Sequence, residues 1–230
     1  MKHPIFFMTI LFEKLGFGEF AHKYPQVVNS WLIMAILIFL AILVRPKINP
    51  LSPTKSQNIW EAIIKGIEDF FVGITGEKGR PYAPLYITLF IYIFLCNIAG
   101  LAPGLYSPTA NPNTNLAMAV VTVIGAEIVG IKTHGVKYSR HFTGPILPLA
   151  VLFIPIEIIG HLARMLSLTF RLFGNILAED LVIAILMFLA GAFLAPLPIY
   201  FLFIFADGVQ AFIFFMLSSM YLAGALEEAH

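Results

Sequence analysis

Residues 156–190 read IEIIGHLARMLSLTFRLFGNILAEDLVIAILMFLA, an apolar stretch that carries several charges and no proline. As one helix it would measure about 52 Å, well beyond a bilayer core of about 30 Å. Residues 199–226 form a second long apolar stretch, of about 42 Å as a helix. We expect the two to form a strongly tilted helical hairpin within 145–226. The alternative is a split of the first stretch near Gly174, but no proline accompanies that glycine, which favours one continuous helix.

The composition of the whole chain is typical of a membrane protein. Of its 230 residues, 59% are hydrophobic and 12% are charged, which is about half the charged share of a soluble domain. The net charge of +1 gives no indication of a nucleic-acid partner. The single cysteine, Cys96, excludes an internal disulfide and a cysteine metal cluster. We therefore expect an all-α polytopic membrane protein without a metal or other cofactor.

Three further apolar runs have the length of conventional transmembrane helices. They cover residues 27–44, 85–103 and 116–131. Residues 1–26 are expected to be a retained segment at the outer membrane surface, because no small-residue cleavage site follows their apolar run. In the loop 45–84, apolar residues recur at helical spacing between positions 59 and 74, which predicts an amphipathic helix lying on the membrane.

The distribution of basic residues predicts the orientation of the chain. Lys and Arg are concentrated in the loops after the first and third apolar runs, whereas residues 104–115 contain none. Basic loops lie on the cytoplasmic side of membranes. The N-terminus is then outside, and two further crossings bring the C-terminus to the cytoplasm.

Charged residues within the apolar last third of the chain are the main functional signal. They are Glu157, Arg164, Arg171, Glu179, Asp180 and Asp207. One such group at the centre of a membrane helix costs about 2.5–3.5 kcal/mol on insertion scales. For Glu157 and Arg164, mutual pairing or contact with the membrane interface explains the charge equally well. For Arg171, in the middle of the helix, that explanation is much weaker, and a functional role is favoured.

Helical geometry arranges these groups on distinct faces. At roughly 100° per residue, one polar stripe contains Glu157, Arg164, Ser167, Arg171 and Asn175. Asp180 faces the opposite side from Arg171, and on the last helix Asp207 and Gln210 lie one turn apart on a shared face. A fixed cation between carboxylates on different faces favours ion movement through two separate aqueous inlets.

The same residues carry a family resemblance. Residues 157–175, EIIGHLARMLSLTFRLFGN, resemble the signature segment of the subunit a family of F-type ATP synthases, whose members are the membrane stators of a proton channel. Residues 97–103, NIAGLAP, and 107–111, SPTAN, are similar to that family's second span and outer loop, and residues 210–214, QAFIF, to its last helix. The resemblance covers the chain from about Asn29 to its end.

The resemblance implies a role for each matching position near the middle of the membrane. Arg171 matches the essential stator arginine, which faces the ring of c subunits. Gln210 matches the last-helix glutamine that neighbours this arginine. Asn175 and Ser167 match polar residues of the same face.

Other matches imply residues of the two proton half-channels. Glu157 matches an acidic residue of the cytoplasmic half-channel, and Asp180 matches one of the outer half-channel. Where some members have a histidine on the final helix, this chain has Phe203, and we expect Asp207 to supply the missing protonatable group. Arg164 either extends the positive stripe toward the cytoplasm or contacts lipid phosphates.

The resemblance further implies a non-catalytic subunit that couples proton translocation to rotation. Its partners would be the c-subunit ring, the b subunits of the peripheral stalk and the remainder of the ATP synthase, in a bacterial inner membrane. A stand-alone ion transporter or channel is the alternative, disfavoured by the small number of spans and the absence of an inverted repeat. An intramembrane enzyme would need a base at helical spacing from Ser167, Ser218 or Ser219, which the sequence lacks.

Overall fold

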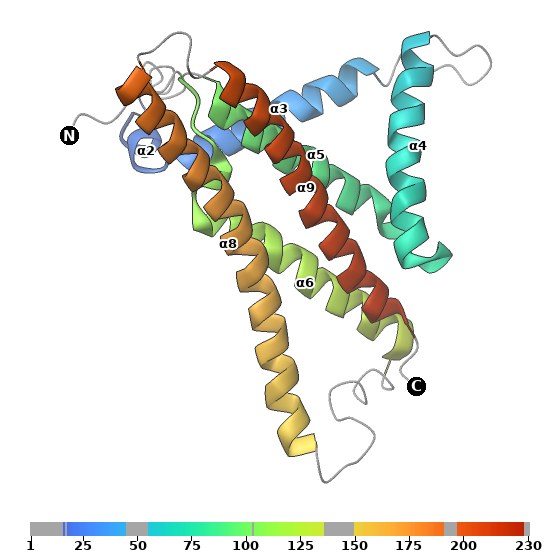
Figure 1. Ribbon diagram of the computed structural model, residues 1–230. Coiled ribbons are helices and arrows are strands. Elements are labelled where there is room, and N and C mark those ends of the chain that lie inside the picture. The colour runs from blue at the N-terminus through green and yellow to red at the C-terminus, as the bar shows by residue number, and fades with distance from the viewer. Residues whose placement is uncertain are drawn as a thin grey trace.

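The computed structural model describes residues 16, 18–44, 55–102, 104–135, 150–190 and 197–227, and its regular elements are all helices (Figure 1). In chain order these are α2 (Gly18–Lys23), α3 (Pro25–Val44), α4 (Lys55–Thr75), the 3-10 helix η2 (Glu77–Tyr82), α5 (Ala83–Leu101), the 3-10 helix η3 (Pro108–Ala110), α6 (Pro112–His134), α8 (Ala150–Ala190) and α9 (Leu197–Leu226). The expected all-α class is therefore confirmed.

Within the described residues, five stretches are long and apolar enough to cross a membrane. They are Pro25–Leu43, Glu77–Leu101, Pro112–His134, Phe153–Leu189 and Pro198–Leu226. The expectation of a polytopic membrane protein agrees with this result. The predicted N-terminal surface segment up to residue 15, residues 45–54 of the first basic loop and residues 136–149 of the second lie outside the described residues.

The long helix α8 runs without interruption for 41 residues. It passes through Gly174, where an added Cβ would meet no atom within 4 Å, so no packing contact requires a glycine there. The alternative of two shorter elements is therefore not found. At 1.5 Å per residue α8 is about 60 Å long. Its tilt relative to a membrane stays a prediction.

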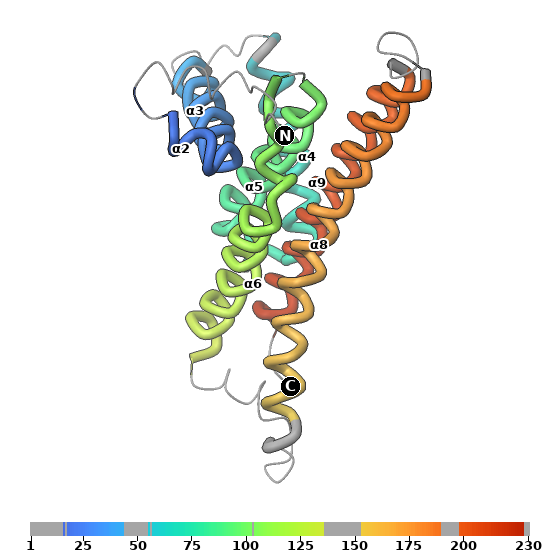
Figure 2. The backbone as a smooth tube through the Cα atoms, turned by 90° about the vertical axis from the view of Figure 1, so that its left-hand side faces the viewer, coloured from blue at the N-terminus to red at the C-terminus, as the bar shows by residue number. Residues whose placement is uncertain are grey.

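The helix α6 packs between the two arms of the hairpin that α8 and α9 form. It contacts both helices extensively, and α5 lies along α9. Figure 1 shows α8 and α9 close at the ends near residues 190 and 197 and diverging from there, and Figure 2 shows them following a similar course when viewed at right angles. Small buried residues of α6 such as Ala119, Ala126 and Gly130 allow this close approach of helices.

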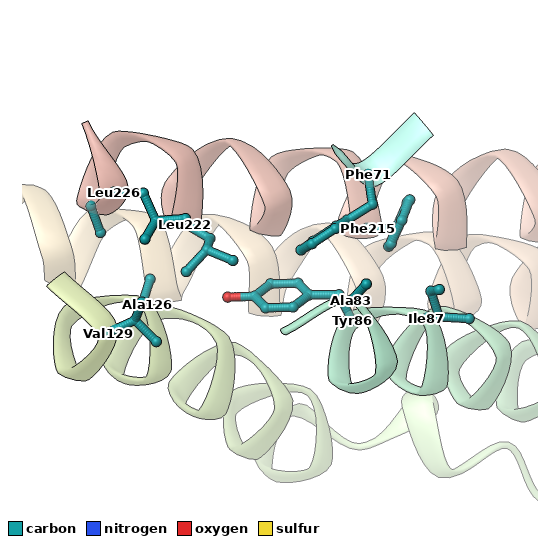
Figure 3. Close-up of a cluster of buried hydrophobic side chains, with 10 residues drawn as sticks. Phe71, Ala83, Tyr86, Ile87, Ala126, Val129, Phe215, Leu222 and Leu226 are labelled. Carbon is teal, nitrogen blue, oxygen red and sulfur yellow. The ribbon is translucent and has the colours of Figure 1, made fainter. Parts of the chain in front are cut away.

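Two buried clusters hold the helices together. The first joins Phe71 of α4, Tyr86 of α5, Ala126 of α6 and Phe215 of α9; Figure 3 shows Tyr86 pointing from α5 toward α6 and α9. The second contains Leu168 and Leu172 of α8 together with residues of α5, α6 and α9 such as Ile93, Met118 and Phe214. The second cluster therefore fixes the rotation of α8 about its own axis.

The predicted amphipathic helix is present as α4, which is not among the five apolar stretches. Its second half packs through Phe71 against α5 and α9. In its first half, apolar side chains such as Ile59 (61% exposed) and Trp60 (57%) are left uncovered by the chain. A position on the membrane surface, with these side chains in contact with lipid, stays a prediction.

Candidate functional site

Arg171 lies in the middle of α8 and is exposed on a side that the described part of the chain does not cover. The buried residues Leu168 and Leu172 point into the second cluster, so the rotation of α8 directs Arg171 outward. No described carboxylate forms an ion pair with Arg171. Its charge is therefore available to an anion outside the described part of the chain.

Small residues surround Arg171 on the exposed side of α8. Ala163, Ser167, Gly174 and Ala178 are all exposed and lie within about 80° of Arg171 around the helix axis. Small side chains allow another membrane helix to approach closely. Of the predicted polar stripe, Ser167 and Arg171 are exposed, whereas Glu157, Arg164 and Asn175 are partly buried. The small residues beside the two exposed positions leave space for a neighbouring helix.

Asn175, one turn beyond Arg171, connects this face to a buried carboxyl group. Its amide Nδ2 donates a hydrogen bond to Oε1 of Glu179 over 2.6 Å. The Glu179 side chain is 5% exposed, and its carboxyl group interacts with that of Asp207 on α9, which is fully buried. The structure therefore brings Asp207 to Glu179, a residue that the sequence analysis left out of the site.

Gln210 follows Asp207 by one turn on α9 and is 8% exposed. Its Nε2 atom is buried and has no hydrogen-bond acceptor among the described residues. No hydrogen bond within the described part of the chain joins Gln210 to Arg171, so the neighbourhood implied by the resemblance stays a prediction. Both Asp207 and Gln210 face the interior, as their shared helical face predicts.

Asp180 is exposed on α8, next to the loop between α5 and α6. Burial raises the pKa of Tyr106 in that loop, and the nearby negative charge of Asp180 raises it further. Glu179 and Asp180 are adjacent in sequence, so they point to different sides of α8, one buried and one open. The pair therefore places one carboxyl group at the surface and one in the interior within a single turn.

A buried network of polar side chains holds the loop between α5 and α6 close to these acidic residues. Thr109 donates from Oγ1 to Oδ1 of Asn97 over 2.7 Å, and Nδ2 of Asn115 donates to the carbonyl oxygen of Thr109 over 2.8 Å. Ser107 donates to the carbonyl of Cys96 over 2.9 Å. Gly100 allows this approach, because an added Cβ would lie 2.8 Å from the Cβ of Ser107.

A second titratable cluster lies at the end of the bundle where α6 ends and α8 begins. Nε2 of His161 is 3.3 Å from Oε1 of Glu157, and Nδ1 of His161 is 3.4 Å from Oε1 of Glu127 on α6. Arg164 places Nη2 3.6 Å from Oε1 of Glu157 and stacks its guanidinium over the ring of Tyr221 on α9, 5.7 Å from the centroid. Pairing between Glu157 and Arg164, one of the two explanations considered from sequence, is therefore found.

From the sequence, Glu179 was recognised as a charge in the apolar segment but was not assigned to the site, and the contact between Glu127 and His161 was not predicted. A signal for Glu179 was present, since it follows Leu168 by eleven residues and Leu172 by seven, on the buried face of α8. No comparable signal was present for Glu127, because its partner depends on how α6 packs against α8. The polar stripe is defined by polar residues alone and contains no information about which face of α8 is buried.

Comparison with known proteins gives a match over nearly the whole chain. The family described as ATP synthase A chain matches residues 27–223. The chain belongs to the ATP synthase subunit a family. Relatives named ATP synthase subunit a include those of Desulfosudis oleivorans (53% identical over 230 residues), Syntrophobacter fumaroxidans (48% over 241) and Geotalea daltonii (44% over 233). Each alignment covers 100% of both proteins.

Membership of the ATP synthase subunit a family confirms the resemblance drawn from residues 157–175. The chain is therefore a non-catalytic membrane subunit of an ATP synthase, and it works within that complex. The five apolar helices agree with an integral membrane position.

Proposed function

We infer that the chain is the stator of the ATP synthase membrane sector, forms two proton half-channels and couples proton flow to rotation of the c-subunit ring. The observation that carries this proposal is that Arg171, in the middle of an apolar helix, is exposed and has no ion-pair partner among the described residues. A buried or lipid-facing guanidinium is costly, and a carboxylate on a c subunit passing along the small-residue face of α8 would neutralise it.

The outer half-channel would consist of the acidic residues near the loop between α5 and α6. A proton entering at Asp180 would reach the buried pair of Glu179 and Asp207, and from there the rotor carboxylate. Asn175 would orient Glu179 through its hydrogen bond. The buried Gln210, one turn from Asp207, would supply a polar wall between this pair and the rotor.

The inner half-channel would begin on the other side of Arg171 and lead to Glu157. An ionised rotor carboxylate would pass Arg171 after losing its proton on this side. Arginine suits a barrier between the two half-channels because a guanidinium stays protonated throughout the physiological pH range, so it does not pass a proton on. Each proton driven across about 100 mV supplies roughly 2.3 kcal/mol, which a direct leak between the half-channels would waste.

The orientation that fits this proposal has the N-terminus outside and the C-terminus in the cytoplasm of a bacterial inner membrane. It places the Asp180 region outside and the Glu157 region inside. The peripheral-stalk b subunits would hold the chain against the turning ring.

Co-purification tests the proposal directly. A tagged form of the chain, solubilised from its native membrane in mild detergent, should elute with a ring of small hairpin proteins and a soluble ATPase head. Elution as a stable monomer that conducts ions on its own in liposomes would contradict the proposal and favour the transporter.

A further inference from the structure

The cluster around His161 joins two helices through one imidazole ring. His161 lies on α8, one turn beyond Glu157, and its Nε2 faces the carboxyl group of that residue at 3.3 Å. Its Nδ1 faces Glu127 of α6 at 3.4 Å. The His161 side chain is only 13% exposed, so the ring lies between two carboxyl groups in a mostly enclosed position.

Arg164 restricts the protonation of this ring. Its Nη1 lies 3.2 Å from Nδ1 of His161, and because a guanidinium can only donate, Nδ1 must accept in that arrangement. The neutral ring then carries its proton on Nε2, the nitrogen that lies 3.3 Å from Oε1 of Glu157. A second proton on Nδ1 would end the hydrogen bond with Arg164 and pair the imidazolium with Glu127 instead.

The groups facing the ring come from each of the helices packed around it. They are Glu157 and Arg164 on α8, Glu127 on α6 and Tyr221 on α9. The guanidinium of Arg164 lies over the ring of Tyr221. Arg164 also lies 3.6 Å from Glu157 through Nη2. When Nδ1 is protonated, the guanidinium therefore still has a carboxylate and an aromatic ring to interact with.

We propose that His161 is the proton relay of the inner half-channel, carrying protons between Glu127 and Glu157, with Arg164 as the positioning residue that selects its tautomer. A proton leaves the Glu127 carboxyl group for Nδ1, the imidazolium releases its Nε2 proton to the Glu157 carboxylate, and Glu157 releases that proton to water. The ring returns to its first tautomer by proton exchange with water, and the driving force sets the direction. This inference rests on the proposed stator function.

The test uses the whole ATP synthase in inverted membrane vesicles, in which the cytoplasmic side faces the bath. ATP-driven proton uptake is measured from about pH 5 to 8, the range in which histidine changes its charge. At each pH, the uptake rate of a variant is divided by the uptake rate of the wild type. For His161→Gln we expect a loss of at least about tenfold near neutral pH. The ratio should also change with pH, because the relay depends on the protonation of the ring.

The matched control is His22→Gln, a histidine on α2 that is exposed and remote from the cluster; its ratio should stay near one. Glu127→Gln keeps the imidazole but removes the carboxyl group that exchanges a proton with Nδ1, so it should also lose uptake, and it carries the test if His161→Gln does not assemble. A ratio near one for either variant, or a loss that is equal at every pH, overturns the relay.

Arg171→Ala in the same assay separates this inference from the proposed function. If Arg171→Ala abolishes uptake while His161→Gln behaves like the wild type, the relay is wrong and the stator function stands. If Arg171→Ala also retains coupled uptake, the proposed function itself is wrong.

Discussion

The side chain of Asn175 donates a 2.6 Å hydrogen bond to Glu179, one turn further along α8. This bond connects the uncovered face that carries Arg171 to the buried carboxyl group that meets Asp207 of α9. The hydrogen bond therefore joins the exposed face of α8 to its buried face. A substitution at either residue is expected to change the position of the other side chain.

Replacement of Arg171 should remove coupling altogether. Arg171→Ala leaves nothing to neutralise a passing rotor carboxylate or to block a direct proton path. Arg171→Lys should also fail largely, because an ammonium lacks the planar fork of the guanidinium and is able to lose its proton. ATP synthesis by reconstituted complexes under an imposed proton gradient measures this. Synthesis retained in Arg171→Ala would contradict the stator role.

The buried acidic pair should carry protons on the outer side. Asp207→Asn and Glu179→Gln each keep the shape of the side chain but remove its protonatable group, so ATP-driven proton pumping should fall by at least about tenfold. Asp69→Asn, at an exposed acidic position on α4, is the control and should pump normally. Wild-type pumping in Asp207→Asn would remove this residue from the proton path.

Two helical glycines should respond differently to alanine. Gly125→Ala adds a Cβ into open space, so it should leave stability unchanged or raise it by up to about 1 kcal/mol through helix propensity. Gly100→Ala places a Cβ 2.8 Å from Ser107 and should lower the thermal unfolding midpoint of the detergent-solubilised complex. Equal midpoints for the two variants would mean that the approach of the loop to α5 does not matter.

The buried network at Thr109 should be sensitive to the loss of one hydroxyl group. Thr109→Val keeps the volume but leaves Oδ1 of Asn97 without its donor, at a cost of about 1–3 kcal/mol for an unsatisfied buried group. Thr88→Val removes an exposed hydroxyl that bonds only the carbonyl of Pro84 in its own helix, so it should cost much less. Thermal unfolding of the two variants in parallel measures the difference, and equal midpoints would show that the network adds no stability.

The fold class and the long hairpin helix were predictable because they depend on properties within one segment. The apolar length of 156–190 and the lack of a proline were sufficient to predict that α8 continues through Gly174. Helical periodicity within the same segment predicted that Arg171 and Ser167 share one side of α8, but not which side of the helix is exposed. Single-segment reasoning also placed Asp207 and Gln210 correctly on one face of α9.

The clusters at Glu179 and His161 were not predictable in this way. Each depends on a residue of another helix, Asp207 in one case and Glu127 in the other. The axial shift and rotation between packed helices decide which side chains meet, and these follow from the packing of small residues such as Ala119 and Ala126 on α6. Periodicity within one helix contains no information about that shift.

The uninterrupted course of α8 has a mechanical consequence. Glu157 and Glu179 are separated by 22 residues of one hydrogen-bonded rod, about 33 Å along its axis, with Arg171 between them. A rod of this kind resists stretching and bending, so the spacing between the acidic groups on either side of the guanidinium is held constant under load. If a rotating neighbour exerts a force on Arg171, α8 would transmit that force through the buried residues Leu168 and Leu172 to the other helices. The whole helix bundle would then resist the torque.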